Sequence, residues 1–467
     1  MMSFLKKLGS FSVGPIVSAF LGFITVPLVT YFISTDEYGR CSMFTLAQSA
    51  AAMLIYLGLD QAFVREYHSF TGRVDRLLAN VIRIPLGVVL VIDVVLVCIP
   101  SRISLILFDT PDEHLAVYLL ALMLPFMVFE NFGLLKIRME ERGLQYSCFV
   151  ILLKALTLVF TVLLFLTYEK SFRSAIYAIA AAEIATGLAL LLFSLRHVPL
   201  LTEPVDRQLL GRMLRFGLPL LPASMLGWAL TSMDKVMLRT MCSYSELGLY
   251  SAAFKIVNVL GVVQSCFTLY WVPLAYRWYE SKREQRFFSE ANDIVACVMS
   301  VMCFGVLLCK DLVALILGAN FAQAVYIFPF IMLHPIMYTM SETTAVGISF
   351  ARKTGYNIVV SALSGGVNIL LNYLLIPAWN GTGAAVATGI SYLVFFWGRT
   401  LISRKIWYRF RLEKYLLYTV LILINCGLHT FVTGWAPYAV SAVSLVVTAA
   451  VNWRPLRSAY EFFRANA

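Results

Sequence analysis

Charged residues are scarce in this sequence. Asp, Glu, Lys and Arg make up 13% of its 467 residues, whereas hydrophobic residues make up 60%. Soluble domains carry about a quarter of their residues as charged side chains, so an ordinary soluble protein is excluded. The apolar runs are about 20 residues long, which is typical of membrane-spanning helices, whereas strands of membrane barrels alternate over about 10 residues. We therefore predict an all-α polytopic membrane protein.

Long polar segments and common catalytic motifs are also missing. The longest interruption between apolar runs, residues 196–215, is too short for a domain of about 50 residues. The sequence contains no HExxH motif and no glycine-rich phosphate loop. Its nine cysteines include no CxxC pair, and most lie inside apolar runs as small buried hydrophobic residues. These absences predict no metal site and no cofactor.

The apolar runs themselves predict about fourteen membrane-spanning helices. They lie at residues 10–33, 41–64, 81–100, 115–135, 147–167, 175–195, 216–239, 247–275, 289–309, 322–345, 358–376, 384–403, 415–433 and 437–452. The first run follows Lys6 and Lys7, as in a signal peptide, but it continues to Ile33 without a clear small-residue cleavage site. We interpret it as an uncleaved first helix.

Basic residues alternate from one side of the predicted helices to the other. Most Lys and Arg residues fall on the side of the N-terminus, and the opposite loops hold only Arg102, Lys170, Arg173 and Lys310. Because basic loops favour the cytoplasm, both termini are predicted to be cytoplasmic, which requires an even number of spans. The same bias, facing anionic lipid headgroups, explains the net charge of +11, so we predict no nucleic-acid partner.

A repeated motif divides the chain. A shift of about 209 residues brings Glu37 onto Glu246 and Gly39 onto Gly248. The repeat predicts an N-lobe of helices 1–6 (residues 1–204) and a C-lobe of helices 7–12 (residues 205–411). Residues 412–467 would form an extra pair, helices 13–14, and a short cytoplasmic tail. Six spans per lobe is an even number, so the lobes would share one topology about an axis along the membrane normal, with a central cleft.

The stretch from Arg215 to Lys255 resembles the seventh and eighth helices of bacterial polysaccharide flippases. These proteins export O-antigen, exopolysaccharide or capsule units and belong to the multidrug/oligosaccharidyl-lipid/polysaccharide (MOP) exporter superfamily. The residues that carry the resemblance are Pro219, Pro222, the pair Asp234-Lys235 and the motif Glu246-Leu247-Gly248-Leu249-Tyr250-Ser251. The resemblance implies a MATE-like fold in the bacterial cytoplasmic membrane and transport by alternating access, without enzymatic chemistry. It further implies a polyprenyl-pyrophosphate-linked oligosaccharide as substrate, membrane lipid around it, and a polysaccharide polymerase or export complex as a candidate partner.

Charged side chains inside the predicted spans are the main candidates for function. Each costs at least about 2.5 to 3.5 kcal/mol at the bilayer centre, so each needs a partner or a water-filled cavity. The candidate cations are Arg40, Lys154, Lys235, Lys255 and Arg399, and the candidate acids are Asp93, Glu130, Glu183, Asp234, Asp293 and Glu342. The resemblance implies that Arg40, Lys235 and Lys255 line the cleft and attract the pyrophosphate.

Polar stripes at helical spacing extend this predicted substrate site. They add Asn258, Gln264, Tyr338, Asn368, Asn372 and Lys154, which offer amide and aromatic contacts to sugars and a further cation. Structural alternatives remain open for the charged groups. Lys235 could snorkel to a helix end, and Lys154 could pair with Glu183. Asp234 could form a salt bridge or couple transport to a cation or proton, and Glu183 is a second candidate for ion coupling.

Two other functions fit parts of the sequence. A membrane-embedded glycosyltransferase or polymerase would need an extracytoplasmic acidic site, for which the turn Asp109–Glu113 is the best candidate. A cation-coupled drug or metabolite exporter of the same superfamily would share the twelve-helix core. The two Glu-x-Gly motifs and the many basic residues favour the polysaccharide branch. Lipid II flippases of this superfamily are richer in arginine on helix 1, and the absence of arginine between Phe11 and Ile33 favours a different glycan carrier.

Overall fold

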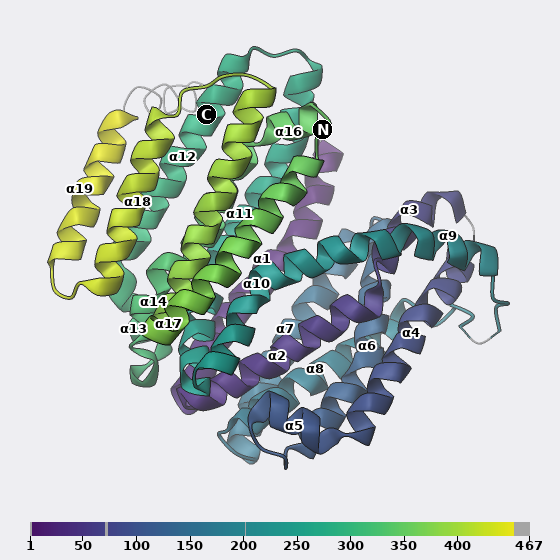
Figure 1. Ribbon diagram of the computed structural model, residues 1–467. Coiled ribbons are helices and arrows are strands. Elements are labelled where there is room, and N and C mark those ends of the chain that lie inside the picture. Colours follow the sequence, from purple (N-terminus) through teal and green to yellow (C-terminus); the bar gives the residue numbers. More distant parts are fainter. Residues whose placement is uncertain (1, 71–72, 201, 453–467) are drawn as a thin grey trace. The chain divides into compact units, whose positions relative to one another are not determined.

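The computed structural model describes residues 2–70, 73–200 and 202–452, apart from the side chains of residues 2–10, 12 and 230. Within these residues every regular element is a helix and no strand forms (Figure 1), which confirms the all-α fold class. Contacts between Cα atoms divide the chain into an N-terminal unit, Met1–Ser232, and a C-terminal unit, Met233–Ala467. The lobe boundaries near residues 204 and 411 stay predictions, and the predicted tail lies outside the described residues.

The N-terminal unit is built from long helices joined by short turns. Helix α1 packs along α7, and α6 lies against both α4 and α8. A hydrogen bond of 2.9 Å from the Gly14 N–H to Ser147 Oγ marks the close approach of α1 and α7. The helices are α1 (Met2–Phe32), α2 (Thr35–Tyr56), α3 (Leu59–Glu66), α4 (Val74–Cys98), α5 (Pro100–Phe108), α6 (His114–Met139), α7 (Gly143–Thr167), α8 (Phe172–Phe193) and α9 (Arg207–Gly217), with 3-10 turns at Tyr67–Phe70 and Leu218–Leu220.

The C-terminal unit begins inside α10 (Leu221–Met241), which crosses the boundary between the units. In this unit α15 packs on α11, α12 and α17, and the predicted extra helix pair, α18 and α19, packs on α12. The helices are α11 (Tyr244–Glu280), α12 (Gln285–Leu308), α13 (Lys310–Leu317), α14 (Ala324–Ile331), α15 (Leu333–Thr344), α16 (Val346–Phe350), α17 (Gly355–Ile406), α18 (Glu413–Phe431) and α19 (Ala436–Val451), with a 3-10 turn at Ala319–Phe321.

Among the described residues, ten helices are long and apolar enough to cross a membrane, or twelve if two bent pairs each count as one span. Helix α17 counts once among these ten, although its 52 residues extend about 78 Å at 1.5 Å per residue, more than twice a hydrocarbon core of about 30 Å. Helix α19 has only 16 residues, so it is shorter than the helices counted here as spans. The multi-pass fold is confirmed, and the count of fourteen spans stays a prediction.

Helix α17 is a hairpin of two helices. Asn380 has φ 50° and ψ −130°, which interrupts the helical backbone. Residues on the two sides of this break meet in antiparallel order, because the Ser364 hydroxyl donates to the Ser391 carbonyl at 2.5 Å and a Cβ added to Gly398 would lie 2.9 Å from Val360. The two arms correspond to the predicted helices 358–376 and 384–403.

The second predicted span, residues 41–64, is not one continuous helix. Leu57 and Gly58 both have positive φ, 49° and 71°, and they separate α2 from α3 with a bend of 47°. The break brings Gly58 against the end of α9, where a Cβ added to Gly58 would lie 2.6 Å from the Gly217 carbonyl oxygen. A glycine pair therefore allows these two backbones to touch.

The predicted repeat has a structural counterpart at the start of α2 and α11. Ser34 and Ser243 are the N-caps of these helices, and each hydroxyl accepts the N–H of a glutamate three residues later, at 3.3 and 3.4 Å. Glu37 returns to the Ser34 N–H at 3.0 Å, which completes a capping box. Glu246 instead accepts the Gly381 N–H at 3.0 Å, so it ties the start of α11 to the turn of the α17 hairpin.

Candidate functional site

A buried carboxylate, Asp234, lies on α10 and is 1% exposed. Four neutral side chains donate hydrogen bonds to it. The Tyr250 and Thr388 hydroxyls lie 2.7 and 2.6 Å from Oδ2, and the Asn368 and Asn372 amides lie 3.0 and 2.5 Å from Oδ1. A carboxylate offers about four acceptor sites, and here all of them are used. Neutral dipoles therefore stabilise the Asp234 charge inside the C-terminal unit.

The α17 hairpin assembles this centre. Asn368 and Asn372 lie one turn apart on its first arm, and Thr388 lies on its second arm. The Asn372 amide also donates to Asn368 Oδ1 at 3.1 Å, and Asn372 Oδ1 is buried without a hydrogen-bond partner among the described residues. Carboxylate, amide and hydroxyl oxygens are the ligands that small hard cations prefer. The arrangement can therefore hold a fixed anion and exchange its donors for a small cation or a proton.

Two lysines lie beside this centre. Lys235 follows Asp234 on α10, and its Nζ lies 5.2 Å from the centre of the Phe254 ring, within the range of a cation–π contact. Lys255 follows Phe254 on α11. It is exposed and interacts electrostatically with Lys235. Asn258 is exposed one turn further along α11. The structure thus brings Lys235 and Lys255 together and places an amide close by along the helix that carries Lys255.

Glu183 of α8 is a buried carboxyl group in the N-terminal unit, 8% exposed. Gln48 Nε2 on α2 donates to Glu183 Oε1 at 2.8 Å. Glu130 of α6 interacts electrostatically with Glu183 and with Lys154 of α7. Lys154 is exposed, and the hydrogen-bond partner that the structure gives Glu183 is Gln48. Sequence analysis identified Glu130 only as an acid inside a predicted span, and it did not identify Gln48 as a candidate.

Arg40 lies in the first turns of α2. Its Nε is 3.2 Å from Asp36, four residues earlier, and its guanidinium lies 5.3 Å from the centre of the Phe172 ring. The Arg40 side chain is 23% exposed and that of Asp36 is 47% exposed, so the ion pair remains open to solvent or ligand. The role of Arg40 in a substrate site stays a prediction.

Tyr338 and Gln264, two further predicted site residues, are both half-buried. The Tyr338 ring stacks on Phe395 at 5.6 Å, and the Arg399 guanidinium lies 6.0 Å from the centre of the Tyr338 ring. Arg399 pairs with Glu342 at 3.0 Å, so these two intramembrane candidates neutralise each other. Tyr338 therefore belongs to a packed aromatic and ionic cluster, and its contact with a glycan stays a prediction.

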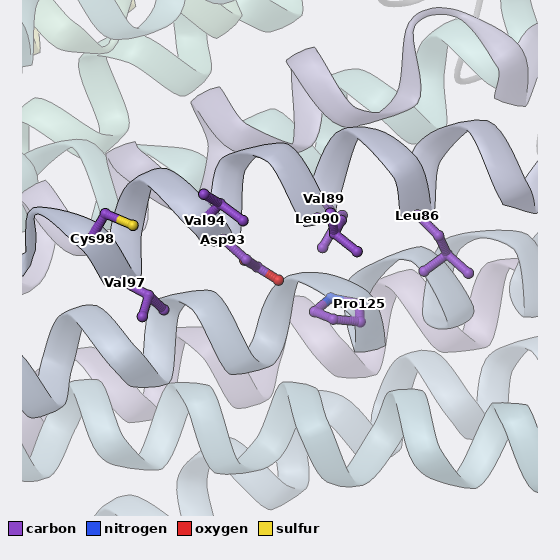
Figure 2. Close-up of a pocket in the computed structure, with 8 residues that line it drawn as sticks. All are labelled: Leu86, Val89, Leu90, Asp93, Val94, Val97, Cys98 and Pro125. Carbon is purple, nitrogen blue, oxygen red and sulfur yellow. The ribbon is translucent and has the colours of Figure 1, made fainter.

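Helices α4 and α6 line an apolar hollow of about 490 Å³ in the N-terminal unit (Figure 2). The Asp93 carboxyl points from α4 into this hollow beside Pro125, and its Oδ1 is buried without a hydrogen-bond partner among the described residues. The neighbouring Leu90 and Val94 are more than half exposed, as suits contact with lipid. Asp93 therefore has an apolar setting that differs from the polar centres around Asp234 and Glu183.

Among the described residues, no group of three or more His, Cys, Asp or Glu side chains could hold a metal ion. The absence of a metal or cofactor in function stays a prediction.

Comparison with known sequences identifies the family. The sequence profile described as "Polysaccharide biosynthesis protein" matches residues 4–277, more than half of the chain. A curated relative, the "Probable low-salt glycan biosynthesis flippase Agl15" of Haloferax volcanii, is 22% identical over 172 residues. That match covers 36% of each chain, so the chain spans about a third of the length of this relative.

Solved structures with the same fold cover most of the chain. The lipid II flippase MurJ in an inward closed conformation has a TM-score of 0.73 at 14% identity, covering 96% of this chain and 99% of that one. An inward-facing multidrug resistance MATE family transporter of the MOP superfamily has a TM-score of 0.54 at 16% identity, covering 85% and 93%. At these identities the likeness shows the fold alone, and it confirms the MATE-like architecture. The chain therefore belongs to the polysaccharide biosynthesis protein family and has the fold of MOP-superfamily transporters, as its repeated motifs predicted.

Proposed function

We propose that this protein is a flippase that moves a polyprenyl-pyrophosphate-linked oligosaccharide across the bacterial cytoplasmic membrane for cell-surface polysaccharide biosynthesis. Membership of the polysaccharide biosynthesis family supports this function, as do relatives named as glycan-biosynthesis and lipid II flippases. Transport proceeds by alternating access from the cytoplasmic to the outer leaflet and needs no covalent step. Its partners are the lipid-linked glycan, the surrounding lipid and a polysaccharide polymerase or export complex.

The observation that carries the proposal is the exposed Lys255 beside Lys235. A pyrophosphate needs fixed cations within an apolar surrounding, and an ammonium held inside a span supplies one. Lys255 lies 11 residues after Tyr244, the first residue of α11, or about 16 Å along the helix at 1.5 Å per residue. Snorkelling over that distance is unfavourable, so the Lys255 ammonium stays within the span.

Amide groups on α11 would contact the sugars, whereas the polyprenyl chain would stay in lipid. Asn258 is exposed and Gln264 half-buried on the same helix as Lys255. Lys154 is a further exposed cation in the N-terminal unit, and Arg40 could bind a phosphate if its ion pair with Asp36 opened. Asn368 and Asn372 are 2% and 0% exposed, so we assign them to the Asp234 centre and not to direct glycan contact.

Ion coupling has a candidate centre in each unit, at Asp234 and at Glu183. Around Asp234 the oxygen atoms of Thr388, Tyr250 and two asparagines surround a carboxylate, a set suited to a small cation. Binding an ion in place of the present hydrogen bonds would change the contacts between α10, α11 and the α17 hairpin. Such a change could bias one transport conformation over the other.

The rival functions have less support. The fold likeness to a multidrug transporter favours a drug or metabolite exporter as the second candidate. For an enzyme, the best candidate site was the acidic turn after α5. There Asp109 ends α5 with φ 62°, and Glu113 is bonded to Arg173 at 2.5 to 3.0 Å, so its carboxylate already has a partner. The relative and the solved structures described above are named as flippases and transporters.

Deletion of the gene tests the proposal. We expect lipid-linked glycan to accumulate in the cytoplasmic leaflet while its synthesis continues, because only translocation is lost. A glycan-binding probe that cannot cross membranes would label this pool in everted vesicles but not in right-side-out vesicles. If deletion abolished assembly of the glycan, the enzyme interpretation would hold. If both assembly and export continued normally, the exporter interpretation would be favoured.

A further inference from the structure

A polar hollow of about 520 Å³ lies at one end of the N-terminal unit, where α4 begins and α6 ends. Its volume falls within the range of about 300 to 1,000 Å³ that is typical of small-molecule sites. The segment between α8 and α9 forms the remaining wall, to which it contributes His197, Pro199 and Glu203. Because α4 begins beside Arg73 and Arg76, this end is the one predicted to face the cytoplasm.

Two side chains of α4 fix the wall that the connecting segment forms. The Arg83 guanidinium donates to the Leu200 carbonyl at 2.7 and 3.0 Å and to the Glu203 carbonyl at 2.5 Å. The Asn80 side-chain oxygen accepts the Asp206 N–H at 2.8 Å. The backbone of this segment is therefore held against α4 on both sides of the hollow's polar residues, and the hollow has defined walls.

Each of the three acids that line the hollow forms an ion pair with a basic side chain. The pairs are Asp75 with Lys136 at 2.7 Å, Glu203 with Arg76 at 3.6 Å and Glu140 with Arg142 at 3.2 Å. Arg73 also lines the hollow, is exposed, and forms no ion pair among the described residues. The hollow thus has one guanidinium more than its acids balance, which favours an anionic ligand.

Hydrogen-bond donors from three elements border the hollow. Arg196 Nε donates to His197 Nε2 at 2.8 Å, so a neutral His197 ring carries its proton on Nδ1 and has an N–H to donate. The Lys136 ammonium donates to Asp75 and to the Ser194 carbonyl at 2.7 and 3.0 Å, and these bonds use two of its three N–H groups. With the Arg73 guanidinium, these donors suit the oxygen atoms of a phosphate.

We propose that this hollow binds a phosphate group through Arg73, His197 and Lys136. An anionic lipid headgroup and a soluble phosphate present the same oxygen atoms, so the chemistry of the hollow fits both. A phosphate that contacts Arg73 and His197 joins α4 to the segment that leads through α9 and α10 into the C-terminal unit, and it would steady that connection. None of these residues belongs to the substrate site proposed above, so the inference goes beyond the flippase function.

Hydrogen exchange of the backbone amides in residues 196–206 tests the proposal on the full-length protein in lipid vesicles. Vesicles of phosphatidylcholine receive sodium phosphate or, at the same ionic strength, sodium chloride, and a second set contains phosphatidylglycerol with chloride alone. A bound phosphate group makes the segment open less often, so its amides should exchange more slowly. Slower exchange with sodium phosphate identifies a soluble anion as ligand, and slower exchange with phosphatidylglycerol identifies a lipid headgroup.

Variants show whether the hollow is responsible. Arg73→Gln and His197→Gln each remove one donor, so each should raise the phosphate concentration that slows exchange by about tenfold or more and should weaken the effect of phosphatidylglycerol. Arg138→Gln is the matched control, because Arg138 is an exposed base in the last turn of α6 that does not line the hollow. It should respond as the wild type does. All three side chains are exposed, so melting temperatures in chloride should be unchanged.

Three results would overturn the site. The first is unchanged exchange in the wild type with both phosphate and phosphatidylglycerol. The second is a wild-type response in both Arg73→Gln and His197→Gln, which would place the anion elsewhere. The third is an equal loss in Arg138→Gln, which would show attraction to the basic surface in general. Arg73 and His197 lie on different elements, so a loss of stability in one variant leaves the other as the test. No step measures transport, so failure of the flippase function would not alter these outcomes.

Discussion

At the scale of single residues, the structure separates the two charged neighbours Asp234 and Lys235. Asp234 is satisfied by Tyr250, Thr388 and two asparagines, so it does not depend on a lysine for stability. Lys235 lies against the Phe254 ring and near Lys255. Two ammonium groups that repel each other are unfavourable in the free protein, and a bound dianion would relieve this repulsion. Asp234 attracts Lys235 and Lys255 repels it, so a bound dianion would add a second favourable charge beside these lysines.

Lys255→Gln should therefore weaken transport with little effect on folding. A charge-assisted hydrogen bond is worth about 1.5 to 3 kcal/mol, so we expect flipping to fall by roughly ten- to a hundred-fold. Lys255→Arg keeps the charge and should retain much of the activity. The measurement is surface glycan in a strain lacking the gene, normalised to the amount of protein in the membrane. Lys353→Gln is a suitable control, since Lys353 is also exposed but lies in the turn before α17.

A structural role for Lys255 would give a different pattern. If Lys255 balanced the Asp234 charge, Lys255→Gln would lower protein abundance and Asp234→Asn would restore it. The four neutral donors around Asp234 argue for the opposite result, because an asparagine there would leave buried donors unsatisfied at about 1 to 3 kcal/mol each. The double variant should thus be less abundant than Lys255→Gln alone. Normal export by Lys255→Gln at normal abundance would exclude a ligand role.

The sequence could identify these polar residues but not their partners. Helical spacing placed Asn368 and Asn372 on one face of a helix, and the structure confirms that they point together. Which helix lies opposite that face depends on contacts across more than a hundred residues, as between Asp234 and Thr388. The hydroxyl group of Thr388 is neutral, so it does not stand out in the sequence as a charged residue inside a span does. Several predicted site residues therefore divide between the buried Asp234 centre and the lysine pair Lys235 and Lys255, and only the packing of the helices reveals this division.

At the scale of elements, the break between α2 and α3 is a departure from the predicted helices. It is packed against α9, an amphipathic helix whose Leu209, Met213 and Gly217 are buried at intervals of four residues. A Cβ added to Gly217 would lie 2.7 Å from the Leu57 carbonyl oxygen. Only a glycine fits between these two backbones without displacement, so α9 holds the bend of the second span in place.

Gly217→Ala should therefore destabilise the protein by about 1 to 3 kcal/mol, the usual cost of overpacking. Gly211 lies on the same helix with open space around its Cα, which provides a matched control. Gly211→Ala should be neutral or stabilising by up to about 1 kcal/mol, because alanine favours helices over glycine. Thermal unfolding of the two purified variants measures the difference. Equal melting temperatures would show that α9 does not pack against the bend in this way.

Long apolar runs made most helices predictable, whereas short elements were not. The arms of α17 correspond to two predicted spans, because each arm is apolar over enough residues to be recognised. Helices α5, α9 and α13 have 9, 11 and 8 residues and lack a long apolar run. The interruption at Leu57 and Gly58 was also missed, because a leucine with positive φ is stabilised by tertiary contact and gives no local signal.

At the scale of the whole molecule, the arrangement of charge along the chain sets its predicted orientation. The predicted spans separate a side rich in basic residues from a side with few of them. Arg286 lies in the first turn of α12 and Lys310 follows the end of this helix, about 36 Å further on at 1.5 Å per residue. That length matches the hydrocarbon core of about 30 Å with a margin at each side. Orientation thus depends on loop charge, whereas the number of spans depends on helix length.

Reporter fusions test the predicted orientation and the predicted number of spans together. Fusions after Lys7, Arg207, Arg286 and Ala467 should all report a cytoplasmic location, because basic residues concentrate on that side.

The decisive comparison is between fusions after Gly434 and after Ala467, which flank α19. Helix α19 has 16 residues and extends about 24 Å, less than the core of about 30 Å, so it can cross only if the bilayer thins or the helix is extended. We expect an outer location at Gly434 and a cytoplasmic one at Ala467, which would establish α19 as a span. An outer location at both positions would show that α19 does not cross and that the number of spans is odd, whereas an outer location at Arg207 or Arg286 would overturn the orientation itself.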